Sequence, residues 1–218
     1  MINLKVSKVL FMKSAIAAAA TLVLFGCGKG GDKTAATPVD GVEVKIGHVA
    51  PLTGPIAHLG KDNENGARLA IEEINKSGLT IDGKKVVLTL VPEDDAEDPK
   101  TATQVAQKLV DAKVAGVVGH LNSGTSIPAS KIYSDAGITQ ISPSSTNPDY
   151  TKQGFKTTYR VVATDAQQGP ALANYAAKGL KAKNVAIIDD ATAYGKGLAD
   201  EFEKTAKANG MTVVAREA

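Results

Sequence analysis

The 218-residue chain is nearly balanced in charge, with 25 Lys and Arg against 23 Asp and Glu, and it is poor in aromatic side chains, with 5 Tyr, 4 Phe and no Trp. Its first 26 residues hold three Lys and no acid, so the remainder carries 22 basic against 23 acidic residues, a net charge of −1. Because nucleic-acid binding needs a concentrated basic surface and rings on which bases stack, this composition argues against a nucleic-acid partner.

The first 26 residues predict export from the cytoplasm. Three lysines precede an apolar run over residues 15–25, which is too short to span a bilayer and is followed by a small glycine. A positively charged start and an apolar core of this length are typical of a secretory signal. Translation can begin at Met1 or at Met12, because either start leaves such a signal intact.

The run Leu24-Phe25-Gly26-Cys27 contains the only cysteine of the chain. It resembles the end of a bacterial lipoprotein signal, which predicts cleavage after residue 26, a lipid on the Cys27 thiol and a membrane-anchored protein in the periplasm. The competing interpretation is a buried cysteine in a membrane-directed helix. A lone cysteine in a mature secreted chain is an unpaired thiol, and this favours the lipoprotein interpretation.

Residues 27–41 predict a flexible tether, because they are small, polar and poor in apolar side chains. The folded part is therefore expected to start at Val42. With its one cysteine committed to lipid, the protein cannot form an internal disulfide. Its fold must depend on the apolar core even in an oxidising compartment.

Strand and helix patterns alternate from Val42 onward. Residues 42–50 predict a strand, and residues 67–74 have the i, i+3, i+4, i+7 apolar spacing of an amphipathic helix that ends at Gly78. The elements predicted next are strand 86–91, a helix after the Asp98-Pro99 cap, strand 114–118, helix 125–135, strand 138–141 and an extended stretch over 156–162.

From Asp165 the alternation restarts. The elements predicted there are helix 167–181, strand 185–188, helix 196–209 and strand 211–215. Alternating strands and helices predict parallel, doubly wound sheets, and the extended crossing before Asp165 predicts two α/β lobes, over residues 42–162 and 163–218. Because the second series holds only two helix–strand steps, we expect it to be the start of an incomplete lobe of a longer protein.

Two loops after predicted strands are dense in hydroxyl groups. Ligands of open parallel sheets bind beyond the carboxyl ends of the strands, and residues 119–125 and 142–148 both lie there. Ser123-Gly124-Thr125 also opens a predicted helix, where unpaired N–H groups favour an anion such as a carboxylate. A single hydroxyl is more often a cap or a turn former, but two such loops on one edge predict a binding site.

The following segments occur in order along the chain: Val44–Gly54, Asp94-Asp95, Asp98-Pro99, Gly119-His120-Leu121 with Ser123, Ser142–Thr146, Asp165 with Gln168-Gly169-Pro170, and Tyr194-Gly195. In these segments the chain resembles the periplasmic leucine/isoleucine/valine-binding proteins of branched-chain amino-acid ABC transporters. The resemblance covers the chain from residue 43 to its end with hardly a gap.

The resemblance implies a two-lobe, type I periplasmic binding protein fold, in which each lobe is a parallel sheet flanked by helices and the C-terminal lobe is incomplete in this chain. It also implies a non-enzymatic receptor without cofactor or metal, which is a monomer when full length. Such a protein captures an amino acid between its lobes, here a branched-chain aliphatic one, and delivers it to an ABC-transporter permease in the inner membrane.

The resemblance also assigns the ligand contacts by motif position. Ser123 and Thr146 would hold the α-carboxylate of the amino acid, and the Ser144 carbonyl and the Thr146 hydroxyl would take its α-ammonium group. Tyr194 would reach in from the second lobe, and Ser145 completes the predicted ligand loop.

Three departures from the family pattern stand out. Family members often have a disulfide between the positions of Glu97 and Asn122, which are not cysteines here. An aromatic residue that often lines the side-chain pocket falls at or next to Leu59. The acid that the family uses against the ammonium group from the second lobe would lie beyond Ala218.

Two other functions compete with the receptor. The first keeps the fold and makes the protein a sensor for amides or other small organic solutes, which a cytoplasmic location would favour. The second is a secreted hydrolase with Ser144 or Ser145 as nucleophile, but the chain has no G-x-S-x-G elbow. The three histidines lack metal-ligand spacing, and the acidic stretch over residues 93–98 predicts a solvated turn, so neither pattern predicts a metal site.

Lipidation at Cys27 can be tested directly. The substitution Cys27→Ala removes the thiol that would carry lipid and is expected to give a soluble or uncleaved protein, because stable anchoring takes two or more acyl chains. Membrane fractionation and palmitate labelling measure this, with Ser14→Ala in the same segment as a control. Unchanged fractionation of Cys27→Ala, together with a wild type that takes up no palmitate, would contradict the prediction.

Overall fold

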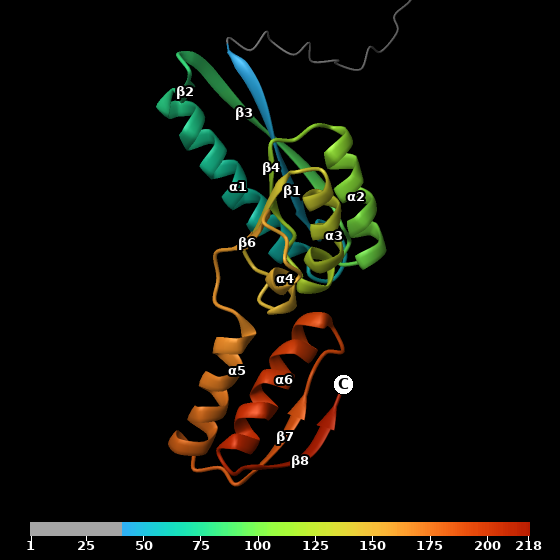
Figure 1. Ribbon diagram of the computed structural model, residues 1–218, viewed down its shortest axis with the longest axis vertical. Helices are drawn as coiled ribbons and strands as arrows, with labels where there is room; N and C mark the ends of the chain where they lie inside the picture. The colour runs from blue at the N-terminus through green and yellow to red at the C-terminus, as the bar shows by residue number, and fades with distance from the viewer. Residues whose placement is uncertain (1–40) are drawn as a thin grey trace, which may run out of the picture. The chain divides into compact units, whose positions relative to one another are not determined.

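The computed structural model describes residues 41–218. The predicted signal, the predicted lipidation site Cys27 and the tether up to residue 40 therefore lie outside the described residues. The described part contains a six-stranded sheet in the order β2-β3-β1-β4-β5-β6 and a two-stranded sheet of β7 and β8 (Figure 1). Helices alternate with the strands, which confirms the predicted α/β class.

The strands are β1 (Val42–Ala50), β2 (Thr80–Ile81), β3 (Lys84–Asp94), β4 (Gly116–Gly119), β5 (Thr139–Ser142), β6 (Thr158–Arg160), β7 (Asn184–Ile188) and β8 (Thr212–Glu217). The helices are α1 (Ala57–Ser77), α2 (Pro99–Asp111), α3 (Ser123–Asp135), α4 (Asp149–Lys152), α5 (Asp165–Asn174), the π-helix η1 (Tyr175–Gly179) and α6 (Ala193–Ala208). None of these helices is long and apolar enough to cross a membrane.

The large sheet is parallel except at one edge. Strand β2, a two-residue edge strand that the sequence analysis did not predict, runs antiparallel to β3, with Thr80 opposite Lys85. The two residues between these strands, Asp82 and Gly83, both have positive φ, at 50° and 73°. An Asp-Gly pair in this conformation makes the two-residue turn whose twist matches a hairpin, so the sequence carried the signal for this element.

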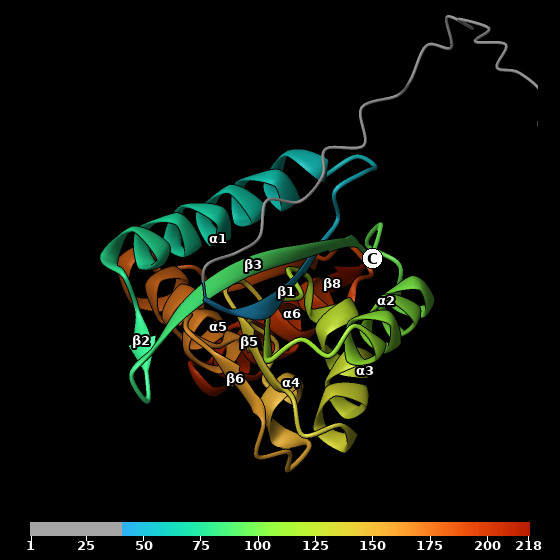
Figure 2. The same ribbon diagram turned by 90° about the horizontal axis from the view of Figure 1, so that it is seen from above.

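The two faces of the large sheet are covered differently. Helices α2 and α3 lie on one face and α1 lies on the other (Figure 2). The core between the sheet and α2 and α3 contains Val49, Leu109, Val117 and Tyr133, which are at most 3% exposed. Strand β1 is central and pairs with β3 and β4, so its last residues are buried from both sides.

Helix α1 approaches the sheet closely at its first turns and less closely farther on. A Cβ on Gly60 would lie 2.0 Å from the carbonyl oxygen of Pro51, so only glycine allows this approach. The predicted apolar face of α1 does point to the sheet, but Ile74 is 38% exposed. Between that face and strand residues such as Ile46 and Leu88 lies an apolar cavity of about 520 Å³.

The small sheet has much exposed apolar surface. Strands β7 and β8 pair in parallel, and α5 packs on α6. Leu172 and Leu180 are 53% and 64% exposed, and Ile188 is 82% exposed. The predicted helix over 167–181 is divided, because α5 passes into η1 at Tyr175.

The core placement of Leu109 predicts a large effect on stability. Leu109→Ala is expected to lower the free energy of unfolding by about 2–5 kcal/mol, because a buried leucine leaves a cavity when it is truncated. Leu69→Ala on α1 is the control, since Leu69 is 57% exposed. Urea denaturation of both variants measures the difference, and equal losses would contradict this assignment of the core.

Candidate functional site

The candidate site lies where β4 and β5 end. These strands are parallel neighbours, with Val118 opposite Ile141, so the loops that follow them lie side by side. The first loop leads directly into α3, and the second leads through Pro148 into the short helix α4. The two hydroxyl-rich segments are thus brought together, as predicted.

The backbone carbonyl of His120 joins the two loops. It accepts hydrogen bonds from the hydroxyls of Ser142 at 2.7 Å, Ser126 at 3.1 Å and Ser145 at 3.4 Å. The Ser142 hydroxyl oxygen in turn accepts from the N–H groups of Ser144 at 3.2 Å and Ser145 at 2.9 Å. One carbonyl therefore fixes the start of the second loop and the first turn of α3.

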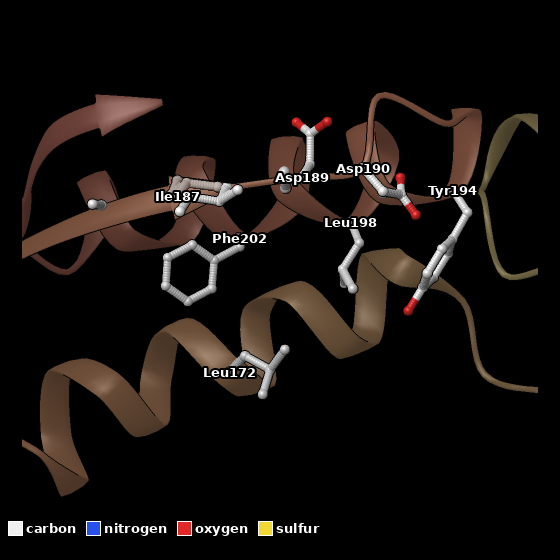
Figure 3. A pocket seen from close by; sticks show the side chains of 11 residues that line it. Leu172, Ile187, Asp189, Asp190, Tyr194, Leu198 and Phe202 are labelled. Atoms are coloured by element: carbon white, nitrogen blue, oxygen red, sulfur yellow. The ribbon is translucent and has the colours of Figure 1, made fainter. Parts of the chain in front are cut away.

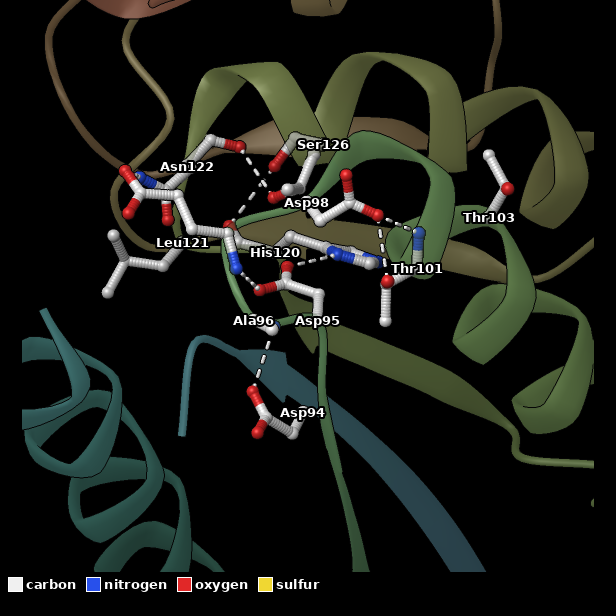
Figure 4. A network of polar contacts seen from close by, with 12 residues as sticks. Asp94, Asp95, Ala96, Asp98, Thr101, Thr103, His120, Leu121, Asn122 and Ser126 are labelled. Atoms are coloured by element: carbon white, nitrogen blue, oxygen red, sulfur yellow. Dashed lines mark hydrogen bonds and ion pairs between the residues drawn. The ribbon is translucent and has the colours of Figure 1, made fainter. Parts of the chain in front are cut away.

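The His120 imidazole is fixed by two further buried groups, Asp95 and Tyr133; Figure 4 shows the contact with Asp95. Its Nδ1 lies 2.8 Å from Asp95 Oδ2 and its Nε2 lies 3.2 Å from the Tyr133 hydroxyl, and all three side chains are fully buried. Because a carboxylate only accepts, Nδ1 carries a proton. Burial raises the pKa of Tyr133 well above its usual range, so its hydroxyl stays protonated.

Arg160 also holds the second loop, and sequence reasoning missed it. Its guanidinium donates to the Ser145 carbonyl at 2.7 Å and to the Thr151 hydroxyl at 2.9 Å, and it lies 5.3 Å from the ring centre of Tyr150. The available signal was weak: Arg160 is one of three arginines and lies within the extended stretch predicted over residues 156–162.

The predicted ligand residues Ser123 and Thr146 are both present at this edge. Ser123 is the first residue of α3, is 2% exposed, and its hydroxyl oxygen accepts the N–H of Asn147 at 3.2 Å. The first N–H groups of a helix have no acceptor within it, so those of Ser123 and Gly124 are available to a ligand. The Thr146 hydroxyl is buried and has no hydrogen-bond partner among residues 41–218.

The other two serines of the predicted site make contacts within the protein. The Ser145 hydroxyl is buried, lies 2.6 Å from the Ser126 hydroxyl and donates to the Leu121 carbonyl at 3.0 Å. The Ser144 hydroxyl donates to Asn63 Oδ1 at 3.1 Å. Because the N–H groups of both residues donate to the Ser142 hydroxyl and the Ser145 carbonyl accepts from Arg160, the Ser144 carbonyl is the group of this pair that is left for a ligand.

Leu59 and Tyr194 lie on separate helices. Leu59 is 43% exposed in the first turn of α1, and its carbonyl accepts from Asn63 Nδ2 at 3.3 Å. Asn63 therefore connects Leu59 to Ser144, and no local pattern in the sequence indicated this link. Tyr194 is 41% exposed in the first turn of α6.

Tyr194 lines a pocket of about 430 Å³ beside β7 (Figure 3). Asp190 lies with it at one end, and Leu172 and Phe202 line the rest. The residue before it, Ala193, contacts the ligand loop through its carbonyl, which accepts from Asn147 Nδ2 at 2.6 Å. A methyl group on Gly124 of α3 would lie 3.7 Å from the Ala193 Cβ.

The positions at which the resembling family often has a disulfide are in contact here. Asn122 Nδ2 donates to Glu97 Oε1 at 3.2 Å. The turn that carries Glu97 is also fixed by its own side chains, because Asp94 Oδ1 accepts the N–H of Ala96 at 2.8 Å and Asp95 Oδ1 accepts the N–H of Glu97 at 3.1 Å. Within residues 41–218 these acids do not form a metal-binding cluster of three or more ligands.

The chain is similar to known proteins over most of its length. The sequence model of a family described as periplasmic binding protein matches residues 43–218. The Leu/Ile/Val-binding protein BraC3 of Rhizobium johnstonii is 44% identical over 181 residues, which are 83% of this chain and 48% of that protein. The chain thus spans about half the length of this curated relative.

Two solved structures of ABC-transporter binding proteins are also similar. The branched-chain amino acid transporter substrate-binding protein LivJ of Streptococcus pneumoniae, in complex with isoleucine, has a TM-score of 0.71 at 34% identity over 80% of this chain and 49% of that one. A solute-binding protein from Rhodopseudomonas palustris, in complex with 3,4-dihydroxybenzoic acid, has a TM-score of 0.69 at 26% identity over 80% of this chain and 47% of that one.

The buried contacts of His120 predict a graded loss of stability. Asp95→Ala removes an acceptor from a buried N–H and is expected to cost about 1.5–3 kcal/mol of unfolding free energy, whereas Tyr133→Phe removes one hydroxyl and should cost about 1 kcal/mol. Lys131→Ala, in the same helix as Tyr133, is the control because the Lys131 side chain is 66% exposed. Denaturant titration measures all three variants. If Asp95→Ala behaves like the control, the network does not support the site.

Proposed function

Because this chain belongs to the periplasmic binding protein family, we propose that it is the substrate-binding component of an ABC transporter and captures a branched-chain aliphatic amino acid for uptake. The relatives named above are binding proteins of this kind, and one of them holds isoleucine. Another relative of the same fold holds a dihydroxybenzoic acid, so the fold alone does not select the ligand. The proposal therefore depends on the chemistry of the site.

The convergence of donors at the start of α3 is the observation that carries the proposal. The N–H groups of Ser123 and Gly124 lie at the positive end of a helix, and Ser123 is joined to the ligand loop through Asn147. The two N–H groups suit the α-carboxylate of an amino acid. The Thr146 hydroxyl, one residue before Asn147, has no partner within residues 41–218. Its oxygen and the Ser144 carbonyl suit the ammonium group as acceptors.

The same geometry favours binding over hydrolysis. A serine nucleophile needs an imidazole within hydrogen-bond reach. The His120 imidazole contacts Asp95 and Tyr133 instead, while only its carbonyl meets the serines. Ser144 donates to Asn63. The related proteins are likewise binding proteins of transport systems, so we propose that this chain is not an enzyme.

The cellular setting follows from the family and from the N-terminal sequence. Members of this family act in the periplasm. We propose that the protein is held there by lipid on Cys27, works as a monomer, and delivers its ligand to a permease in the inner membrane. The tether over residues 27–41 would give the folded part freedom to reach that permease.

The site assignment predicts which substitutions weaken binding. Ser123→Ala and Thr146→Ala in the full-length protein are each expected to weaken binding of the best ligand about tenfold to a hundredfold, because a hydrogen bond to a charged group contributes about 1.5–3 kcal/mol. Tyr194→Ala should also weaken binding through loss of contact from α6.

Calorimetric titration with leucine, isoleucine, valine and small polar amino acids measures these effects. Thr103→Ala on α2 is the control, because the Thr103 hydroxyl donates to the carbonyl of Lys100 in the same helix. If Ser123→Ala and Thr146→Ala both bind as tightly as wild type, the assigned site is wrong. If the wild type binds none of these amino acids, the proposed function is wrong.

A further inference from the structure

Asp165 is a buried acid that the proposed ligand contacts do not use. It is the first residue of α5, its side chain is fully buried, and neither carboxylate oxygen has a hydrogen-bond partner within residues 41–218. A buried carboxylate without partners is costly, so such a group invites a functional explanation.

The position of Asp165 is set by the ligand loop. Its backbone N–H donates to the Thr146 carbonyl at 2.9 Å. Burial raises the pKa of Asp165, whereas the nearby Thr146 hydroxyl and the Arg160 guanidinium favour the charged form. Arg160 does not pair with it directly within residues 41–218, because the guanidinium donates to the Ser145 carbonyl and the Thr151 hydroxyl instead. The Thr146 hydroxyl is thus a neighbouring donor that favours the charged carboxylate.

Helix α6 packs against the Asp165 carboxylate at Gly197, which has no side chain that could donate a hydrogen bond. A Cβ on Gly197 would lie 3.5 Å from Asp165 Oδ2 and 2.6 Å from Asn147 Nδ2. Glu201 on the same helix adds a like charge nearby, which favours the neutral acid. Nothing on α6 thus supplies Asp165 with a cation.

The Thr146 hydroxyl links this buried acid to the ligand. A hydroxyl has one proton and two lone pairs. If its oxygen is to accept a hydrogen bond from an ammonium group, its proton must be donated to another acceptor. Asp165 is an acceptor beside it with no other partner in the described residues. A hydroxyl that donates to a carboxylate is also a better acceptor, because hydrogen bonds in a chain strengthen one another.

We propose that Asp165 is a positioning residue that accepts the Thr146 proton, turns the Thr146 oxygen toward the ligand, and makes the site select ligands that carry a protonated amine. This inference rests on the proposed function. Selection for a protonated amine would distinguish this chain from relatives of the same fold that bind an acid without an amine, such as the protein in complex with 3,4-dihydroxybenzoic acid.

A purely structural role predicts something different. Asp165 lies in the first turn of α5, where a negative charge complements the helix dipole. If this were its whole role, replacing it would weaken all ligands alike. The two roles are therefore distinguished by two ligands that differ only in the amine.

The experiment compares L-leucine with 4-methylpentanoate, which has the same carbon skeleton and carboxylate and lacks the amine. Calorimetry or competition on the full-length protein gives the ratio of their dissociation constants. In Asp165→Asn we expect leucine affinity to fall about tenfold to a hundredfold while 4-methylpentanoate affinity changes less than about twofold. Thr146→Val should produce the same selective loss, and the double variant should lose little more than either single one.

Asp149→Asn is the matched control, because Asp149 is an exposed acid near the same loop and should leave the ratio unchanged. If Asp165→Asn does not fold, Asp165→Ala serves in the same comparison. An unchanged ratio in the Asp165 variant, or equal losses for both ligands, would overturn the inference. A wild type that binds neither ligand nor any other amino acid would instead overturn the proposed function.

Discussion

The candidate site depends on the hydrogen bonds that the carbonyl oxygen of His120 accepts. Three serine hydroxyls from two different segments meet at this atom, so the first turn of α3 and the loop after β5 share one anchor. The position of His120 is itself held through its imidazole, which Asp95 contacts from the turn after β3 and Tyr133 contacts from α3. A buried polar network of this kind is stabilising only when all of its members are satisfied. The base of the candidate site is therefore held by satisfied hydrogen bonds, while the groups proposed to bind the ligand, the Thr146 hydroxyl and the first N–H groups of α3, have no hydrogen-bond partner among residues 41–218.

The anchor also explains why the loop hydroxyls have different roles. Ser142 and Ser145 hold the loop, because their hydroxyls donate to backbone carbonyls beneath it. Thr146 lies one residue farther on, and its hydroxyl is left free of protein partners in the described part of the chain. Sequence alone cannot separate these roles, since all of them are small hydroxyl residues in one loop. The separation follows from which hydroxyls reach the carbonyls of His120 and Leu121 and which do not.

Local signals accounted for most of the secondary structure. Gly78 ends α1 in the left-handed conformation, and Asp98 caps α2 through the N–H of Thr101, ahead of Pro99, as their positions in the sequence predicted. The hairpin of β2 and the short helix α4 were missed, although Asp82-Gly83 signals the first of them. For the candidate site, the residues themselves predicted only its location at the carboxyl edge of the sheet.

The contacts that build that place join residues far apart in the chain. Ser144 meets Asn63, which precedes it by 81 residues, and Asn147 meets Ala193, which follows it by 46. Such pairings depend on how α1 and α6 are packed, and no periodicity or cap encodes them.

The Glu97–Asn122 pair was only partly predictable from the resemblance. The sequence showed that the disulfide often found at these positions is absent, but it did not show that the two side chains form a hydrogen bond. Asp95–His120 and Glu97–Asn122 form two successive links between the same segments, each spanning 25 residues. A disulfide across such a loop restricts the unfolded chain, whereas these hydrogen bonds act only in the folded one. In this protein the two segments are therefore held together by one buried and one partly buried polar contact.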